Sequence, residues 1–449
     1  MKKGIVVLLL LFTNFFAKAQ HEGHNMPKDS AKKNLNHDMH NMPMDSIPSV
    51  HSMSHSFSLN LPMNRNGSGT GWLPDSTPMF GYMVHIKKWM FMFHGNVFFR
   101  YNNQDITNKG SRGNKKWDAP NWLMAMGQKK IGKKGLFHFS SMFSLDNVIA
   151  GGSGYPLLFQ TGETFRGKPL VDRQHPHDLF SELSVSYSQA INSTTDVYVY
   201  LGYPGEPALG SVAFMHRVSS LYNPDAPLSH HWNDGTHITF GVATLGVRYG
   251  KFKLEGSSFT GREPDENRYD LDKPLFDSYS GRLSFNPNAN WALQVSQGFI
   301  KSPESIRPEE NVDRITASAI YSKPFNHNNF ISATALWGLN RSHANENAVL
   351  LEGSLVLNRW AIYGRYEWVQ KSSDELDLDE NIYSHEVSFN VNAITLGFSI
   401  NTMRSKFLNM AIGVQGTYFS TDSRLNNLYG RNPLSAEVYL RFFPPMKKI

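Results

Sequence analysis

The sequence predicts an all-β fold: an antiparallel transmembrane β-barrel of about 16 strands, within a range of roughly 14 to 18, preceded by a disordered tail rich in histidine and methionine. Three observations predict it. The chain opens with an export signal, it then repeats units of about ten residues in which apolar and polar residues alternate, and its connections alternate between short and long. A soluble sandwich also alternates, but aromatic residues at the ends of the apolar units of an exported chain favour a barrel with lipid outside and water inside.

Residues 1–19 have the composition of a secretory signal peptide. Lys2 and Lys3 precede an apolar run at 5–12, and small residues stand at Ala17 and Ala19. A basic start, a short apolar region and a small-x-small end are the features of a cleaved export signal. The apolar run is too short for a membrane-spanning helix, which needs about 20 residues. We therefore expect the mature chain to begin at Gln20 and to be exported.

Charge and cysteine content exclude several classes of partner and site. Residues 1–19 carry three lysines and no acidic residue, so cleavage lowers the formal net charge from +6 to +3. So small a charge predicts no nucleic-acid partner. The chain has no cysteine, which excludes disulfides and thiolate metal ligands.

Residues 20–78 are predicted to be a disordered periplasmic tail and linker. The pattern His-x-x-His-Asn-Met-Pro-x-Asp-Ser occurs at 21–30 and again at 37–46, and no aromatic residue lies between Gln20 and Phe57. A segment with so little apolar surface cannot fold alone.

The same tail predicts a copper site. Imidazole suits Cu(II) and soft thioether sulfur favours Cu(I), whereas zinc sites rarely include methionine. Silver would bind the same thioethers. A plain polar linker is the alternative, but the repetition of both residue types favours metal binding. The predicted ligands are His21, His24, Met26, His37, Met39, His40, Met42, Met44, His51, Met53 and His55.

Residues 79–449 are predicted to form the barrel. At 407–419, for example, Met410, Ile412 and Val414 alternate with small or polar residues, which is the pattern of a strand with two different faces. Residues 79–87 are either an extra strand or a segment in the lumen. The predicted strands lie near 89–101, 119–129, 135–147, 179–191, 195–204, 236–249, 251–261, 279–287, 290–300, 312–323, 328–341, 347–357, 359–370, 382–402, 407–419 and 434–443.

The connections between these strands predict how the barrel sits in the membrane. Short ones lie at 250, 286–288, 323–326, 358 and 404–406, and long ones at 102–118, 148–178, 205–235, 262–278, 301–311, 371–381 and 420–433. Short periplasmic turns and long outer loops are the outer-membrane arrangement. An even number of strands also places both termini, and with them the tail, in the periplasm.

Polar clusters between 172 and 240 flank an apparent hairpin, so they are expected to meet at one rim of the barrel. Metal binding there would use His175, His177, Asp178, His216, His230, His231 and His237. A structural network is the favoured alternative, with Asp178 and Asp234 as partners of the imidazoles. A hydrolase triad is a third interpretation, but no Gly-x-Ser-x-Gly motif stands near these histidines, and Gly67-Ser68-Gly69 is assigned to the flexible linker. The charged residues at 262–266 form either a constriction or a solvated tip.

Several strings between 172 and 300 resemble a family of Gram-negative outer-membrane barrels that has no firmly assigned activity. They are His-Pro-His-Asp at 175–178, Gly-Glu-Pro-Ala-Leu-Gly at 205–210, His-His-Trp-Asn-Asp at 230–234 and Gly-Arg-Glu-Pro-Asp-Glu at 261–266. Members of that family resemble copper-resistance outer-membrane proteins, which pair a His/Met-rich leader with a barrel. The resemblance implies an outer-membrane location and contact with its lipid.

Together these observations predict an outer-membrane barrel that binds or passes copper and contributes to metal tolerance, with a periplasmic metal-handling protein as a partner. The alternative is a general or substrate-specific porin whose tail buffers metal incidentally. An outer-membrane hydrolase is the third candidate. The main interpretation expects no enzymatic activity and no cofactor besides the copper ion.

Overall fold

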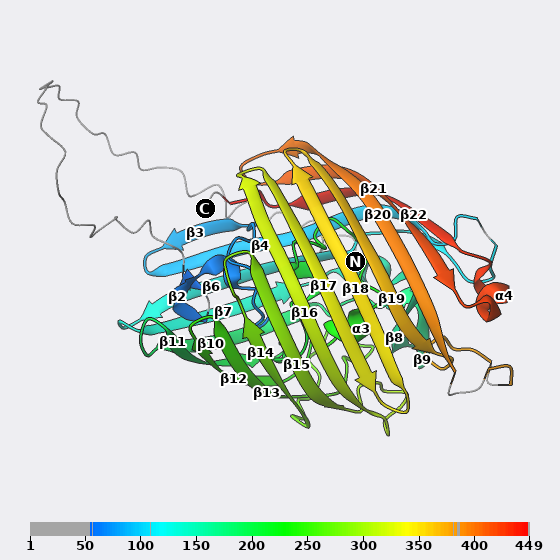
Figure 1. The fold of residues 1–449 in the computed structure, drawn as a ribbon, viewed down its shortest axis with the longest axis horizontal. Coiled ribbons are helices and arrows are strands. Elements are labelled where there is room, and N and C mark those ends of the chain that lie inside the picture. The colour runs from blue at the N-terminus through cyan, green and yellow to red at the C-terminus, as the bar shows by residue number, and fades with distance from the viewer. Residues whose placement is uncertain (1–53, 56, 108, 380, 384–386, 448–449) are drawn as a thin grey trace, which may run out of the picture. The chain divides into compact units, whose positions relative to one another are not determined.

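The structure is a computed structural model that describes residues 54–55, 57–107, 109–379, 381–383 and 387–447. Within this part of the chain, sixteen antiparallel strands close into a barrel (Figure 1), which confirms the predicted fold class. The wall strands are β4 (Trp89–Asn103), β6 (Asn121–Ile131), β7 (Gly135–Phe143), β10 (Phe180–Ala190), β11 (Thr195–Gly202), β12 (Val242–Tyr249), β13 (Phe252–Phe259), β14 (Ser278–Phe285), β15 (Trp291–Lys301), β16 (Asn311–Asn326), β17 (Asn329–Arg341), β18 (Asn345–Leu357), β19 (Trp360–Ser372), β20 (Ser388–Arg404), β21 (Asn409–Thr421) and β22 (Leu434–Phe443).

Apolar side chains point outward from the wall and polar ones point inward. On β21, Ile412 and Val414 are exposed while Gln415 and Thr417 are buried. Elsewhere Leu245 and Leu396 are 70% and 67% exposed, whereas Arg282 and Glu255 are buried inside. A soluble protein has the opposite distribution, so this surface suits a barrel surrounded by lipid.

The barrel closes along a seam at β4. Residues 97–103 of β4 pair with β22, and residues 89–93 of β4 pair with β3 (Tyr82–Ile86). The backbone amide of Gly81 donates to Pro445, and that of Lys447 donates to Met79, so residues 79–81 continue the pairing beside the chain end. Residues 79–87 therefore provide an extra short strand outside the wall count. On its other side, β4 pairs with β5 (Lys115–Asp118) and β6.

The helices are short, and among the described residues none is long and apolar enough to cross a membrane. They are α2 (Asp146–Ala150), α3 (His230–Asn233), α4 (Asn426–Tyr429), and the 3-10 turns η1 (Met63–Arg65), η2 (Phe214–His216) and η3 (Ser423–Leu425). The connection between β7 and β10 carries a separate hairpin of β8 (Tyr155–Phe165) and β9 (Lys168–Gln174).

Residues 57–78, which we call the N-terminal segment, are not the disordered linker that the sequence predicts. After β1 (Ser54–His55), they form β2 (Ser58–Pro62), η1 and a series of turns. Ser58 Oγ donates to Asp196 Oδ2 at 2.7 Å, and Ser76 Oγ donates to the carbonyl of Ser322 at 2.6 Å. Ser68, predicted to lie outside the barrel, is 4% exposed. Inward-facing polar groups of distant strands supply the partners that the segment lacks in its own sequence.

Candidate functional site in the barrel interior

The long connection between β11 and β12, residues 203–241, folds into the barrel, and we call it the plug loop. Its residues reach inward-facing side chains around much of the wall. Ala208 donates to Ser257 Oγ on β13 and Gly210 donates to Ser296 Oγ on β15, each at 2.8 Å. Further polar contacts are to β4, β11, β14, β17, β18, β19, β21 and β22.

Two buried arginines tie the plug loop to the wall. Arg217 of the loop binds Asp234 at 2.6 Å and Glu352 of β18 at 2.8 Å. Arg100 of β4 binds Asp225 of the loop at 2.6 Å, and it also pairs with Asp118 and Glu437. A buried charge is costly without a partner, so these pairs fix the loop in one position.

Five of the seven residues predicted to meet at the rim do come together, in what we call the histidine cluster: His175, His177, His230, His231 and His237. The ring centroids of His230 and His237 are 4.9 Å apart, those of His230 and His231 are 5.2 Å apart, and those of His177 and His237 are 5.5 Å apart. The rings of His175, His177, His230 and His237 are buried, the side chain of His231 is 13% exposed, and α3 packs against β16, β17 and β18.

Each of these imidazoles uses one nitrogen in a hydrogen bond or ion pair. The Nδ1 atoms of His177, His230 and His231 face Asp146 at 2.8 Å, Asp234 at 2.6 Å and Glu263 at 3.2 Å. His237 Nδ1 contacts the carbonyl of Asp234, and His175 Nε2 lies 3.3 Å from Glu163. The carboxylate partners could not be predicted from a local sequence pattern, because they are far in sequence from the histidines that they contact. They are Asp146, Glu163 and Glu263.

The other two predicted residues lie differently. Asp178 pairs with Arg268 at 3.3 Å, and Asp146 takes the role beside His177 that the sequence assigned to Asp178. His216 is outside the cluster, and its ring lies 4.8 Å from Trp122 and 5.7 Å from His94. It differs because η2 carries its side chain toward β4 and β6.

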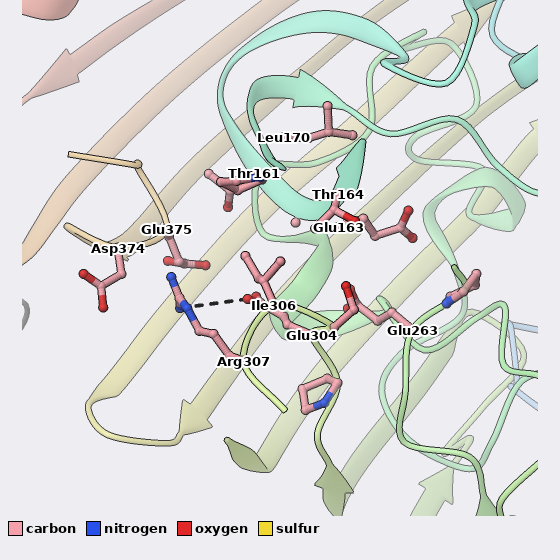
Figure 2. Close-up of a pocket in the computed structure, with 15 residues that line it drawn as sticks. Thr161, Glu163, Thr164, Leu170, Glu263, Glu304, Ile306, Arg307, Asp374 and Glu375 are labelled. Atoms are coloured by element: carbon pink, nitrogen blue, oxygen red, sulfur yellow. Dashed lines mark ion pairs between the residues drawn. The ribbon is translucent and has the colours of Figure 1, made fainter. Parts of the chain in front are cut away.

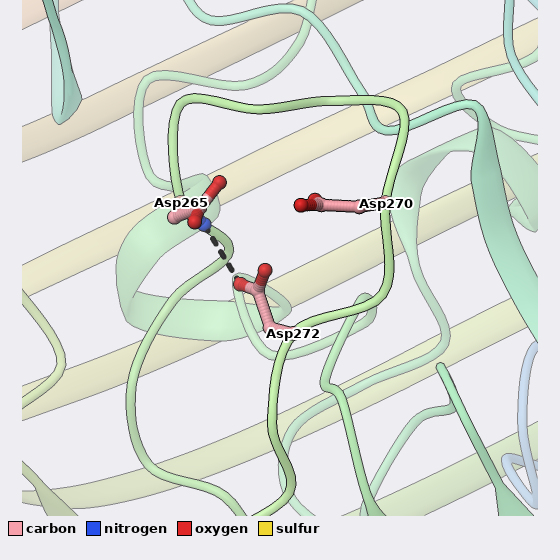
Figure 3. A group of neighbouring side chains, drawn as sticks. All are labelled: Asp265, Asp270 and Asp272. Carbon is pink, nitrogen blue, oxygen red and sulfur yellow. Dashed lines mark hydrogen bonds between the residues drawn. The ribbon is translucent and has the colours of Figure 1, made fainter.

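Each imidazole of the histidine cluster is paired through one nitrogen, as expected for a structural network, while the second nitrogens of His175, His177, His231 and His237 are buried without a hydrogen-bond partner among the described residues. Among the described residues, the group of three acidic or imidazole ligands that comes within 4.8 Å is Asp265, Asp270 and Asp272 in the exposed 260–277 connection (Figure 3). The imidazole nitrogens do not converge in this way. Metal binding by the cluster stays a prediction. So does copper binding by the tail, whose residues 20–53 lie outside the described part.

Burial sets the protonation of this region. It lowers the pKa of His231 to about 3 and holds the pKa values of His175, His230 and His237 below their ordinary range. Burial alone would raise the pKa of Asp234, but Arg217 and His230 outweigh it and hold that pKa well below its usual value. The imidazoles are therefore neutral at pH 7 while Asp234 is charged.

An acidic pocket lies beside the cluster at the end of the barrel that carries the long loops. Figure 2 shows Glu163, Glu263, Glu304 and Glu375 around it, with Arg307 3.9 Å from Glu304. Burial raises the pKa values of Glu163, Glu263 and Glu304 to about 7. Glu263 comes from the charged string at 262–266, and its side chain is 17% exposed, so one end of that string is half-buried rather than a solvated tip.

Comparisons with known proteins show the fold and nothing finer. No protein-family model matches the sequence, and no curated protein matches it. Salmonella typhi OmpF, solved in complex with daunomycin, is 9% identical with a TM-score of 0.50, over 81% of this chain and all of that one. An anion-selective porin from Comamonas acidovorans is 12% identical over 79% of this chain and 99% of its own, at a TM-score of 0.46. Pseudomonas putida OprB is 9% identical over 79% and 94%, at 0.44.

Proposed function

We propose that the protein is a selective outer-membrane pathway of porin architecture, closed at rest by its own chain, rather than an enzyme. The observation that carries this proposal is the plug loop, which bonds to inward-facing groups on ten wall strands. The apolar outer surface and the fold shared with OmpF support a place in the outer membrane.

Selective passage follows from what fills the lumen. The N-terminal segment bonds to inward-facing groups of β11, β13, β14 and β16, and the plug loop bonds to most of the remaining wall. An open porin instead keeps a water-filled channel. A solute can cross this barrel only when part of the loop or of the segment moves, so we expect small and intermittent conductance.

A reversible cross-link tests this requirement. Ser219 Oγ of the plug loop lies 2.7 Å from Thr334 Oγ1 of β17, and the chain has no native cysteine. The double variant Ser219→Cys, Thr334→Cys, joined by a disulfide or a short bifunctional thiol reagent, should conduct less in planar bilayers than its reduced form. Ser219→Cys alone is the control. Equal conductance before and after linking would refute a moving plug, and no conductance from the reduced form would refute a pathway.

Copper handling is the second candidate function, because β4, β6 and β7 carry methionines that are buried inside the barrel. Deleting the gene should raise copper sensitivity, and the wild-type gene should restore tolerance. A gene with leucine at Met26, Met39, Met42, Met44 and Met53 should restore it only in part, since those thioethers are the predicted Cu(I) ligands of the tail. Unchanged tolerance in the deletion strain would leave the porin interpretation with an incidental tail.

A further inference from the structure

The lumen-facing side of β4, β6 and β7 breaks the rule that a barrel lumen is polar. Met90 and Met92 on β4, Met124 and Met126 on β6, and Met142 on β7 are all buried on the lumen side. Met92 pairs directly with Met126, and Met124 with Met142. Lumen-facing positions of such barrels are normally polar. Five thioethers on three adjacent strands therefore need an explanation.

Two other parts of the chain bring more methionine to the same place. Met63 lies in η1 of the N-terminal segment, Met79 directly follows that segment, and Met215 lies in η2 of the plug loop. Eight of the eleven buried members of this cluster are methionines, and none is leucine, isoleucine or valine. The cluster around Phe159 is packed instead with leucine, valine and aromatic residues. Gap filling alone would not select one residue type from three separate segments.

A cavity of about 90 Å³, which we call the methionine chamber, opens among these side chains. Met63, Met79, Met92, Met126 and Met215 line it. It is large enough for one desolvated ion but not for an organic solute of ordinary size. The wall, the N-terminal segment and the plug loop each contribute at least one thioether.

Two imidazoles also line the chamber. His94 of β4 and His216 of η2 face Trp122 from 5.1 Å and 4.8 Å, and their own ring centroids are 5.7 Å apart. His94 Nε2 is buried and has no hydrogen-bond partner among the described residues.

Thioether sulfur and neutral imidazole are soft or borderline ligands that carry no charge. A set made mostly of thioethers favours a monovalent soft cation over Zn²⁺, whose sites use cysteine, histidine and carboxylate, and over Mg²⁺ or Ca²⁺, which favour oxygen ligands. Arg441 also lines the chamber, with its guanidinium stacked over Phe443 and its Nε donating to Asn96, so the lining also carries a positive charge.

We propose that the methionine chamber binds one Cu(I) or Ag(I) ion through the thioethers of Met92, Met126 and Met215 and an imidazole of His94 or His216. The site is separate from the histidine cluster and from the tail. It deepens the second candidate function, and its existence does not depend on conduction or on copper tolerance. An ion held here would touch the wall and the plug loop at once, so binding also links the metal to the part that must move.

Silver binding by the purified barrel tests the proposal, because Ag(I) has the ligand preference of Cu(I) without its redox chemistry. All chains carry Leu for Met and Gln for His throughout residues 20–55, so the tail supplies no soft ligand. The chamber variant combines Met92→Leu, Met126→Leu and Met215→Leu. The matched control combines Met90→Leu, Met124→Leu and Met142→Leu, which lie in the same cluster but do not line the chamber. Such swaps conserve side-chain volume, so packed interiors tolerate them well.

The parent chain and the control should each hold one tightly bound Ag(I) per barrel in competition with a soluble thioether, and the chamber variant should hold none. Equal binding by the two triple variants would overturn the proposal. Heat-modifiable gel migration shows whether each variant folds. If the chamber variant does not fold, the double variant His94→Gln, His216→Gln takes its place and should weaken Ag(I) binding about tenfold or more. Unchanged affinity in this double variant, with the chamber variant unfolded, would equally count against the site.

Discussion

Single charged residues decide how the interior of this barrel is held together. Arg100 is fully buried and meets carboxylates from three places: Asp118 at the outer end of the wall, Asp225 in the plug loop and Glu437 on β22. Each pair alone would be a weak argument for stability, because desolvation offsets attraction. Together they make one cation the partner of three buried anions.

Arg100→Met should therefore destabilise the barrel by about 3–5 kcal/mol, since it leaves three carboxylates buried without their cation. Urea unfolding in lipid vesicles measures the change. Arg424→Met is the matched control. Its partner is Asp422 at 2.7 Å, but the Arg424 side chain is 51% exposed, so the loss should be below about 1 kcal/mol. Similar losses for the two variants would show that the interior behaves like solvent.

At the scale of elements, the plug loop is where protonation and packing meet. Burial lowers the pKa values of four cluster imidazoles, so their contribution to stability is complete above about pH 6.5 and declines as the pH falls toward 3. Burial raises the pKa values of Glu163, Glu263 and Asp178 to about 7. Their contribution is complete below about pH 4 and is lost as the pH rises through 7.

As the pH falls from about 6.5 to 4.5, the imidazoles lose their contribution to stability while the carboxyls gain theirs, so the two effects oppose each other. Below about pH 4 only the imidazoles still change stability. We expect the plug loop to stay packed down to about pH 4.5 and to loosen between about pH 4 and 3. Amide exchange of residues 203–241, corrected for its intrinsic pH dependence, measures this. His231→Gln removes one titrating ring and should move the onset to lower pH. Loosening that begins already near pH 6 would mean that the carboxyls do not compensate.

Sequence patterns predict elements well where the cause is local. The apolar and polar alternation of β21 repeats every second residue, and lipid outside and polar groups inside impose that period directly. The sixteen wall strands accordingly fall close to their predicted places. Ends differ where a loop competes: the strand predicted at 382–402 begins at Ser388, and the one predicted at 236–249 begins at Val242. His237 thus belongs to the plug loop.

The interior could not be predicted because its contacts join residues far apart in the chain. Ser58 donates to Asp196 and Arg217 donates to Glu352, and no sequence pattern links the members of either pair. The methionine chamber was missed for another reason. On β4, Met90 and Met92 alternate with Phe91 and Phe93, so both faces are apolar and the period alone does not show which residues point inward. The sequence did hold one signal for the chamber: methionines lie in both strands of the hairpin predicted at 119–147.

The whole molecule presents an apolar surface around a charged interior, and this arrangement has meaning only in a lipid bilayer. Leu396 lies at the middle of β20 and is 67% exposed, while Ile382, in the connection before that strand, is 72% exposed. In water the two positions would be equivalent. In a bilayer the first lies in hydrocarbon and the second in solvent.

Leu396→Arg should therefore cost about 2–4 kcal/mol of unfolding free energy in lipid vesicles, because a charge on the lipid face near the midplane loses its hydration. Ile382→Arg should change stability by less than about 0.5 kcal/mol, as an exposed substitution outside the bilayer does. Urea unfolding of the two variants beside the parent chain measures both. The pair controls for the chemistry of the substitution, since each replaces an exposed aliphatic residue by arginine. If both variants were as stable as the parent, the apolar surface would not face hydrocarbon, and the transmembrane orientation of the barrel would be wrong.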